Sequence, residues 1–556
     1  MMSKYWALSA IAALVLSGCS GDDDNSIPPI FGDDKEETVE INNQDIGGGQ
    51  VLFYSTTGEY KGAANVGNLP DMVTFSHDGK FLVSANEGEP NDDLSVDPEG
   101  SISIIEIDRT EEILVRDVTT LTFDDSIVDS DVRIKPGATA SIDLEPEYVA
   151  ITEDDKKAFI SLQENNAMAY VDLETKTITA VKSLGAKDFD RIDIDSKDDA
   201  NVATAPDNIF GLYMPDTITS YNVGGADYFI TANEGDDRDD WSDVYTDYWK
   251  ASDLLDDLGE QFSAQLTTDI LDVSGKKKLR VLNDLGKDEN GIYTELYIAG
   301  TRSFSIWDAQ GNQVFDSGVD FEDTVAAAHP TQFNTRVDNT DDANDIQELI
   351  DDSVPYEMIG DTAYFFEGVD ARSQKKGVEP EALSVAKIGD KVFAYIGLEK
   401  QGGLFVYDVT NPAAATMVQY FNDIDYTKLP TQAGDLAPEG MVTFVQDGSN
   451  YLAVANELSS TVAIYELAAD GTVTKLDSLA VGSFDEGAAE ILSYDPESRA
   501  LYATNSEEQR VEIISVADPL NLVVSGNIDF SEYADDLQSV SVKDGLVAIA
   551  VKRKEN

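Results

Sequence analysis

The stretch LPDMVTFSHDGKFLVSANEGEPND, residues 69–92, contains the two short motifs whose recurrence decides the fold. Pro70-Asp71 precedes an apolar, strand-like run, and a His-Asp-Gly-Lys turn at 77–80 separates that run from a second one ending in Asn86-Glu87-Gly88. Two apolar runs around a short Asp-Gly turn are typical of a β-hairpin. The stretch therefore predicts two antiparallel strands, with one acid at the start of the first and another at the end of the second.

Both acidic motifs recur along the chain. The first motif, an acid directly before an apolar run, returns in Glu145-Pro146-Glu147, Met214-Pro215-Asp216, Glu379-Pro380-Glu381, Ala437-Pro438-Glu439 and Ala488-Ala489-Glu490. The second motif follows 16 to 18 residues later, in Gln163-Glu164, Asn233-Glu234, Leu398-Glu399, Asn456-Glu457 and Ser506-Glu507. A third strand-like run comes next, so each unit is an antiparallel meander. Repeated meanders of about four strands are typical of propeller blades.

The repeat predicts an all-β fold: a β-propeller with seven or eight blades, each a four-stranded antiparallel sheet. The segment 539–550 supplies only two strands, and the segments 50–55 and 59–66 supply two more. We expect these N- and C-terminal strands to share one blade and so close the ring, which leaves no long open edge. Counting 279–300 as the start of a further blade gives eight blades. Seven result if 216–316 forms one elaborated blade.

The N-terminus indicates export. Lys4 precedes an apolar run that ends in Leu16-Ser17-Gly18-Cys19, and a short apolar core closed by small residues is typical of a signal peptide. Cys19, the only cysteine of the chain, resembles the acylated residue of a bacterial lipobox. We therefore expect a signal peptide at 1–19, lipidation of Cys19 and a membrane anchor. Ser20 is not the aspartate that would suggest inner-membrane retention, which favours an outer-membrane lipoprotein of the cell envelope.

The rest of the chain divides into a tether and one domain. Residues 20–48 are acidic and poor in apolar side chains, which predicts a flexible tether. Residues 49–556 are expected to form a single propeller domain with insertions at 236–291 and 317–377.

The charge is extreme, with 38 Lys plus Arg against 107 Asp plus Glu and a formal net charge of -69. Such a surface repels phosphate backbones, so nucleic acid is excluded as an expected partner. General solubility in a salty medium accounts for much of this charge, because salt screens the self-repulsion. It does not account for the positions of the motif acids.

The repeat geometry predicts that the motif acids gather at one place. The start of one strand and the end of its antiparallel neighbour lie on the same side of a sheet, and first strands line the channel of a propeller. We expect an inner ring of carboxylates at one channel mouth, which are the candidate metal ligands Asp71, Glu147, Asp216, Glu381, Glu439 and Glu490. A wider set on the same face would comprise Glu87, Glu164, Glu234, Glu399 and Glu457.

Oxygen-only ligands favour a hard cation, so the expected cofactor is Ca²⁺. The chain has only two histidines, His77 and His329, which disfavours a zinc site and a Ser-His-Asp mechanism. The acidic loops 234–240 and 190–199 are further candidates for cation binding. The structural alternative is that the motif acids only brace the blades, through backbone N–H groups or pairs with Arg302, Arg372 and Lys400.

The motifs resemble the choice-of-anchor I family of exported proteins. The matching stretches are residues 69–92, DPEGSISII (97–105), ITANEGDDRDD (230–240), GTRSFSIWD (300–308), GVEPEAL (377–383) and APEGMVTF (437–444). In the family's usual order the units found at 487–491 and 539–550 of this chain come first, so the chain looks circularly permuted. Relatives labelled alkaline phosphatase-like or phytase-like imply a β-propeller that hydrolyses phosphate esters with carboxylate-held Ca²⁺.

Three hypotheses follow. The first is a calcium-dependent phosphoesterase with Arg302 and Arg372 as phosphate clamps. The second is a non-catalytic module that binds a phosphoester or a surface polymer on its acidic face. The third is that cations only hold the blades together.

Overall fold

The computed structural model describes residues 48–91, 94–109, 115–195, 197, 199–238, 245–271, 278–531 and 533–553. The predicted signal peptide, Cys19 and residues 20–47 of the predicted tether lie outside this part of the chain. No helix in the described residues is long and apolar enough to span a membrane.

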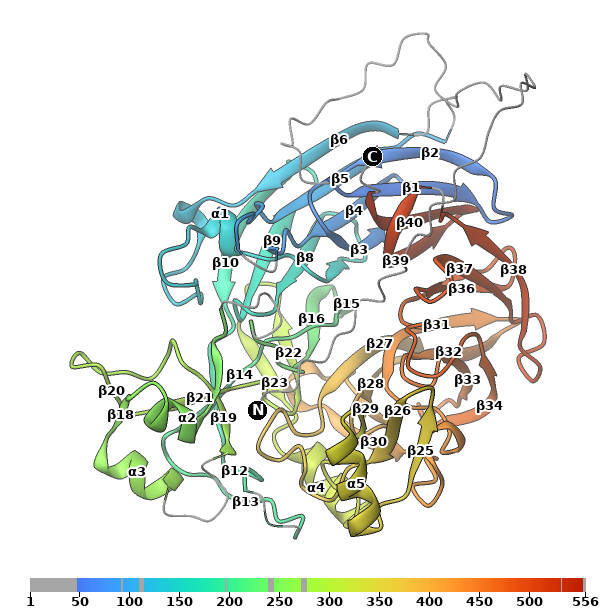
Figure 1. Cartoon of the computed structure of the whole chain (residues 1–556). Helices are drawn as coiled ribbons and strands as arrows, with labels where there is room; N and C mark the ends of the chain where they lie inside the picture. The colour runs from blue at the N-terminus through green and yellow to red at the C-terminus, as the bar shows by residue number, and fades with distance from the viewer. Residues whose placement is uncertain are drawn as a thin grey trace, which may run out of the picture. The chain divides into compact units, whose positions relative to one another are not determined.

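The described residues form an all-β fold that contains seven four-stranded antiparallel sheets (Figure 1). In each sheet one edge strand contacts the corresponding edge strands of two other sheets, and this strand is called the inner strand. These contacts run in the order β3, β7, β15, β27, β31, β35 and β39, and β39 contacts β3 again. Meander sheets that meet through their inner strands are the plan of a β-propeller.

Each sheet runs from its inner strand outward through three further strands. The first four sheets are β3 (Pro70–Phe75), β4 (Phe81–Asn86), β5 (Ser101–Ile107), β6 (Val115–Thr122); β7 (Val149–Ile151), β8 (Lys157–Leu162), β9 (Ala167–Asp172), β10 (Thr177–Ser183); β15 (Ile218–Val223), β16 (Ala226–Ala232), β22 (Phe304–Asp308), β23 (Gln313–Asp316); and β27 (Pro380–Ile388), β28 (Lys391–Leu398), β29 (Leu404–Asp408), β30 (Thr416–Phe421). The other three are β31 (Pro438–Gln446), β32 (Ser449–Asn456), β33 (Thr461–Leu467), β34 (Val473–Ala480); β35 (Leu492–Asp495), β36 (Ala500–Asn505), β37 (Arg510–Ser515), β38 (Val523–Asp529); and β39 (Ala534–Lys543), β40 (Leu546–Arg553), β1 (Gln50–Ser55), β2 (Tyr60–Asn65).

The N- and C-terminal strands share one sheet, as the sequence predicts. β40 pairs antiparallel with both β39 and β1, so Ile549 lies between Val540 and Leu52. Figure 1 shows β1 in blue beside β39 and β40 in red.

Residues 216–316 contribute one four-stranded sheet, whose second and third strands are β16 and β22. Residues 279–300, which the eight-blade alternative assigns to a further blade, form β19, β20 and β21. These strands pair with β17, β18 and β14 rather than with one another, so they form no four-stranded sheet.

Elements outside the seven sheets lie in a few connecting segments. Between β10 and β15 are β11 (Ala186–Asp188), β12 (Arg191–Ile192), β13 (Ala203–Thr204) and β14 (Ile209–Leu212). Between β16 and β22 are β17 (Tyr248–Lys250), α2 (Ala251–Asp256), β18 (Gln261–Phe262), α3 (Ala264–Leu271), β19 (Arg280–Leu282), β20 (Ile292–Tyr293) and β21 (Leu296–Ala299). Between β23 and β27 are α4 (Asp320–Ala328), β24 (Val337–Thr340), α5 (Ala343–Asp352), β25 (Tyr356–Ile359) and β26 (Thr362–Phe366), and α1 (Ala140–Asp143) precedes β7.

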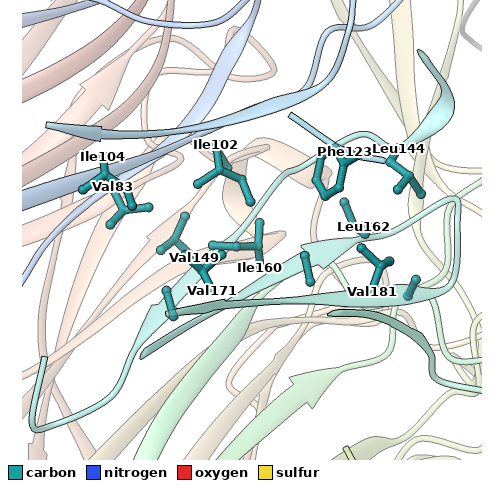
Figure 2. Close-up of a cluster of buried hydrophobic side chains, with 14 of the residues drawn as sticks. Val83, Ile102, Ile104, Phe123, Leu144, Val149, Ile160, Leu162, Val171 and Val181 are labelled. Atoms are coloured by element: carbon teal, nitrogen blue, oxygen red, sulfur yellow. The ribbon is translucent and has the colours of Figure 1, made fainter. Parts of the chain in front are cut away.

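The core lies between adjacent sheets. Figure 2 shows Ile102 and Ile104 of β5 opposite Val149 and Ile160 of the next sheet. Because side chains alternate along a strand, Ile105 points to the other side and packs in a separate cluster with the sheet of β1. Each such strand is buried on both faces, which explains why it is almost continuously apolar.

Candidate functional site

The inner strands surround a cavity lined by residues from all seven sheets. One part, about 270 Å³ in volume, is lined by β3, β7, β15, β27, β31, β35 and β39. An adjoining part of about 320 Å³ shares Met72, Tyr148 and Ile491 with it. This second part, called the acidic mouth, is lined by four of the predicted ligands, which are Asp71, Asp216, Glu439 and Glu490. The fold therefore brings acids from four repeat units together at one end of the cavity.

A backbone hydrogen bond joins the two motifs within a unit. The N–H of Glu87 donates to the Leu69 carbonyl at 2.8 Å, and the N–H of Glu457 donates to the Ala437 carbonyl at the same distance. The accepting residue lies two positions before the first-motif acid. Similar bonds join Gly235 to Met214 and Glu399 to Glu379, and a further one joins Ser506 to Gly487, which lies three positions before Glu490. This bond holds the start of the first strand beside the end of the second, which places both motif acids on one side of the sheet.

The accepting residues have a backbone conformation that is rare outside glycine. Leu69 has a φ of 47° and Ala437 a φ of 58°, and Met214 and Glu379 are also left-handed. Such residues cost about 1–3 kcal/mol each and cluster at functional sites. The turn that presents the acids is therefore held by its surroundings, not by its own preference.

The two remaining predicted ligands, Glu147 and Glu381, lie close to the acids of the mouth. Burial raises the pKa of Glu381 well above its ordinary value, and the charges of Glu234, Glu439 and Asp216 raise it further. Burial also raises the pKa of Glu147, with Glu164 as the next cause. The inner ring and the wider set thus form one electrostatically linked group.

Crowding of buried carboxylates raises the pKa of most members of this group. Burial raises the pKa of Asp71 to about 7, with Glu164 adding to the shift, and burial with nearby Asp236 brings the pKa of Glu164 itself to about 7. The pKa values of Asp216 and Glu439 lie well above the ordinary range for the same reasons. Without a compensating cation these groups would hold protons near neutral pH.

Several of these carboxylates have a buried oxygen with no hydrogen-bond donor among the described residues. They are Glu147, Glu164, Glu381 and Glu439 with one oxygen each, and Glu145 with both. A buried unpaired carboxylate oxygen costs free energy unless a proton or a metal ion compensates it. Ca²⁺ prefers oxygen ligands, among them carboxylates, so these residues fit the predicted cofactor.

Sequence reasoning assigned no role to Glu145 or Glu379, although both begin a Glu-Pro-Glu motif. The second acid of that motif was the signal available in the sequence. In the structure Glu145 is 1% exposed, and burial raises its pKa well above the usual value, with the charges of Glu164 and Glu87 raising it further. Glu379 lies instead in an ion-pair network. Its carboxylate and those of Glu234 and Glu399 approach within 4.8 Å of one another.

Three basic side chains match those three acids. Lys376 Nζ lies 2.9 Å from Glu234 Oε1 and 3.7 Å from Glu379 Oε2, while Arg372 bonds Glu379 and Lys400 bonds Glu399. Burial alone would raise the pKa of Glu379, but Arg372 and the two lysines hold it at about 2. The charges of this trio are therefore balanced by the protein itself.

Neither predicted phosphate clamp lines the acidic mouth. Arg372 is 5% exposed and is bound to Glu379. Arg302 is 2% exposed; it pairs with Glu322 at 2.6 Å and donates to the carbonyls of Asp193 and Ser373 at 2.6 and 2.8 Å. Arg302 thus joins three separate segments, and Arg372 forms an ion pair within its own segment.

The histidines occupy unrelated positions. His77 Nδ1 lies 2.9 Å from Asp155 Oδ1, at the part of the cavity away from the mouth acids. His329 packs edge-on against Tyr420 and Tyr426, and burial lowers its pKa.

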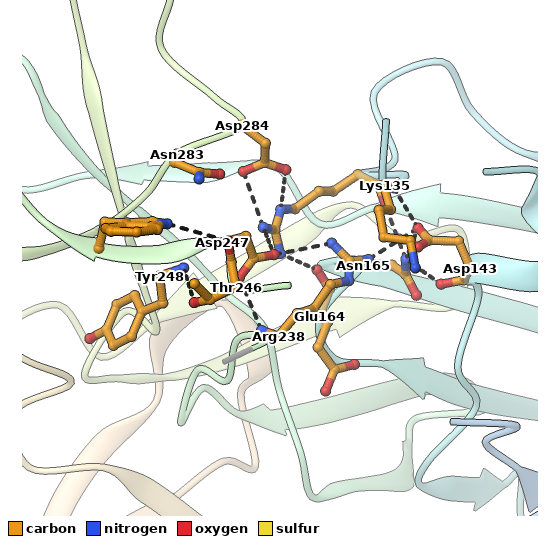
Figure 3. Close-up of polar contacts among 12 residues, drawn as sticks. Lys135, Asp143, Glu164, Asn165, Arg238, Thr246, Asp247, Tyr248, Asn283 and Asp284 are labelled. Carbon is orange, nitrogen blue, oxygen red and sulfur yellow. Dashed lines mark hydrogen bonds and ion pairs between the residues drawn. The ribbon is translucent and has the colours of Figure 1, made fainter. Parts of the chain in front are cut away.

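A second ion-pair network holds the insertion between β16 and β22 next to the acids (Figure 3). Arg133 donates to Asp284 of the insertion at 2.8 Å and to the carbonyl of Glu164 at 2.8 Å. Arg238 lies 3.1 Å from Asp143 and 3.4 Å from Asp247. All of these side chains are nearly inaccessible to solvent, so the network positions the backbone of Glu164.

Comparison with solved structures finds proteins of similar extent but low identity. The periplasmic gluconolactonase of Pseudomonas aeruginosa is 12% identical, with 86% of this chain and 98% of that chain covered and a TM-score of 0.40. The hydrazine synthase of Kuenenia stuttgartiensis is 12% identical, with 87% and 96% covered and a TM-score of 0.40.

Among curated proteins, Gigasin-3a of Magallana gigas is 28% identical over 131 residues. That match covers 23% of this chain and 38% of Gigasin-3a, so the chain spans well under half of that relative. The family model of the choice-of-anchor I domain matches residues 34–412, which is more than half of the chain. On the strength of that match, this protein belongs to the choice-of-anchor I family.

Proposed function

We propose that the protein is a lipid-anchored cell-envelope β-propeller whose acidic mouth binds Ca²⁺ and, through it, phosphate esters. The observation that carries the proposal is a group of buried carboxylate oxygens that have no donor within the described part of the chain, contributed by Glu147, Glu164, Glu381 and Glu439. The anchor at Cys19 and the outer-membrane location rest on the N-terminal sequence alone.

The ring is proposed to be closed and to have seven blades. Two observations support this: inner-strand contacts return from β39 to β3, and one part of the cavity is lined by all seven inner strands. In this arrangement the sheet shared by β1 and β40 is the closing blade.

The donor set suggests how the residues would act in phosphoester hydrolysis. Glu147, Glu381 and Glu439 would hold Ca²⁺, with Asp71, Asp216 and Glu490 beside them. When bound, Ca²⁺ supplies a positive charge for phosphate oxygens and lowers the pKa of a coordinated water. Without a cation the pKa values of Asp71 and Glu164 are both about 7. A bound cation would lower them, so both carboxylates would be ionised and able to accept a proton near neutral pH.

One observation favours a non-catalytic binding module as the second candidate. The basic side chains near the mouth, Lys376, Lys400 and Arg372, are all held in ion pairs with Glu234, Glu399 and Glu379. A phosphate would then depend on the cation alone for positive charge, which suits capture of an anionic ligand or polymer as well as turnover.

Calcium titration by calorimetry, followed by assays on p-nitrophenyl phosphate and inositol hexakisphosphate, tests both candidates. Glu439→Gln should weaken Ca²⁺ binding at least tenfold, whereas Glu466→Gln, at an exposed position of β33, should not. Turnover that chelation abolishes and Ca²⁺ restores supports the enzyme. Tight Ca²⁺ binding that Glu439→Gln weakens, with Ca²⁺-dependent binding of inositol hexakisphosphate but no turnover, supports the binding module. No Ca²⁺ binding by the wild-type protein contradicts both.

A further inference from the structure

A second group of carboxylates lies outside the acidic mouth, where the loop after β12 meets the segment between β26 and β27. One carboxylate oxygen each from Asp193, Asp199 and Asp370 lies within 4.8 Å of the others. Asp193 and Asp370 are buried, with 2% and 4% of their surface exposed. The two segments are about 170 residues apart in sequence, so only the fold unites them.

One carboxylate of this group has an oxygen that the protein does not satisfy. Asp193 Oδ1 accepts the N–H of Asp195 at 3.3 Å, but Asp193 Oδ2 is buried and has no hydrogen-bond donor among the described residues. A carboxylate oxygen in this position needs a ligand or a proton, because burying it bare is costly.

The neighbouring carboxylate is held in place. Asp370 Oδ2 accepts the N–H groups of Asp199 and Ala200, both at 2.9 Å, and Asp370 Oδ1 accepts the hydroxyl of Ser373 at 2.9 Å. These bonds fix Asp370 in a left-handed turn with a φ of 62°. The carboxylate that faces Asp193 is therefore preorganised.

Among the described residues, basic groups balance only part of the charge of this group, since Arg302 lowers the pKa of Asp193 but not enough to offset burial and the neighbouring acids. Arg302 is the buried cation beside Asp193, but its Nη1 pairs with Glu322 and with the Asp193 carbonyl, and Nη2 donates to the carbonyls of Ser373 and Lys375. Lys197 pairs with Asp195 at 2.7 Å. Burial, with Asp370 and Glu322 adding to it, raises the pKa of Asp193 to about 8.

We infer that Asp193, Asp199 and Asp370 form a binding site for a hard divalent cation, for which Ca²⁺ is the best match to an all-oxygen donor set. The cation ties the loop after β12 to residues 370–379. That segment also carries Arg372, Lys376 and Glu379, so the site stabilises the network beside the acidic mouth. It does not depend on phosphoester binding or turnover.

Asparagine at position 193 distinguishes a cation from a shared proton. In chelator, Asp193→Asn removes like-charge repulsion and places an amide donor next to Asp370, so its melting temperature should equal or exceed that of the wild type. In Ca²⁺ the order should reverse, because the wild-type protein gains a ligand and the variant gains less. An equal Ca²⁺ gain for wild type, Asp193→Asn and Asp370→Asn would overturn the inference.

Tryptic cleavage after Lys197 supplies a local measurement in the full chain, since this side chain is about half exposed. Ca²⁺ should slow this cleavage at least tenfold in the wild type and in Glu439→Gln, but not in Asp370→Asn. Metal analysis after dialysis should show one fewer Ca²⁺ per chain for Asp370→Asn. Protection that is lost in Glu439→Gln and kept in Asp370→Asn would assign the effect to the mouth and refute this site. Mg²⁺ at the same concentration should protect less.

Discussion

Lys376 Nζ lies 2.9 Å from Glu234 Oε1, although the two residues are 142 positions apart in sequence. The lysine comes from the segment before β27, and the glutamate ends the second motif of the sheet that contains β15. Burial lowers the pKa of this lysine, whereas four nearby acids, Asp236, Glu234, Glu379 and Asp237, raise it. The acids prevail, so its pKa lies well above the ordinary value. The pair shows how a connecting segment neutralises acids that the repeat brings together.

Replacing Lys376 by methionine should destabilise the protein by about 3–5 kcal/mol, because it leaves buried carboxylates uncompensated. Urea unfolding measures the change. The double variant with Glu234→Gln should recover part of the loss. Lys391→Met is the control: Lys391 forms an exposed pair with Asp408 at 2.8 Å and should cost about 1 kcal/mol or less. Equal losses for the two lysines would contradict this account.

In the presence of a chelator, the stability of the protein should decrease as the pH rises from acid to neutral. Because folding raises the pKa values of Asp71, Glu147, Glu164 and Asp216, the folded protein binds these protons more tightly than the unfolded chain. For Asp71 and Glu164 the stabilising contribution is complete below about pH 4, the ordinary range of unfolded carboxylates, and is lost as the pH rises through about 7. Glu147 and Asp216, whose pKa values are also raised, act in the same direction. Melting temperature measured from pH 4.5 to 8 should therefore fall.

Ca²⁺ should abolish this decrease in melting temperature, because the ionised carboxylates then bind the cation instead of repelling one another. The stabilisation by Ca²⁺ should accordingly grow with pH over the same range. Glu379, with its pKa lowered to about 2, acts oppositely, but its contribution is lost only as the pH falls below about 4. A melting temperature in chelator that rises steadily from pH 4.5 to 8 would exclude the protonated mouth.

The sheet shared by the chain ends should be essential for stability. Ile549→Ala, at a fully buried position between Leu52 and Val540, should cost about 2–5 kcal/mol by leaving a cavity. Leu520→Ala, at a position 68% exposed, should change stability by less than about 0.5 kcal/mol. If the unfolding curves of the two variants coincide, this sheet has no closing role.

The lipid anchor can be tested apart from the fold. Cys19→Ser should abolish incorporation of labelled palmitate and shift the protein from the membrane fraction to the released fraction, because the acylated thiol is lost. Its melting temperature should remain that of the wild-type domain. Continued membrane association of the variant would show that another feature anchors the chain.

The sequence was sufficient for the class of fold and for the idea of an acidic face. Spacing between Asp71 and Glu87, repeated in five more units, predicted hairpins with an acid at each end, and the structure shows the backbone bond that aligns such motifs. It also predicted that strands near both termini share a sheet. These features could be predicted because they depend on local sequence: alternating apolar residues and short turns specify a meander wherever they occur.

Tertiary structure alone decided which acids keep free oxygens and which are neutralised. Glu381 and Glu399 belong to one repeat unit, yet Glu399 pairs with Lys400, while one Glu381 oxygen has no partner in the portion of the chain that the structure describes. Arg302 and Arg372 looked available as clamps, but both are buried in ion pairs formed with residues of the connecting segments. Asp193 and Asp370 meet although no periodicity relates them. The charge of each group depends on its burial and on whether a residue from a distant segment pairs with it. Neither is encoded in the spacing of the repeat.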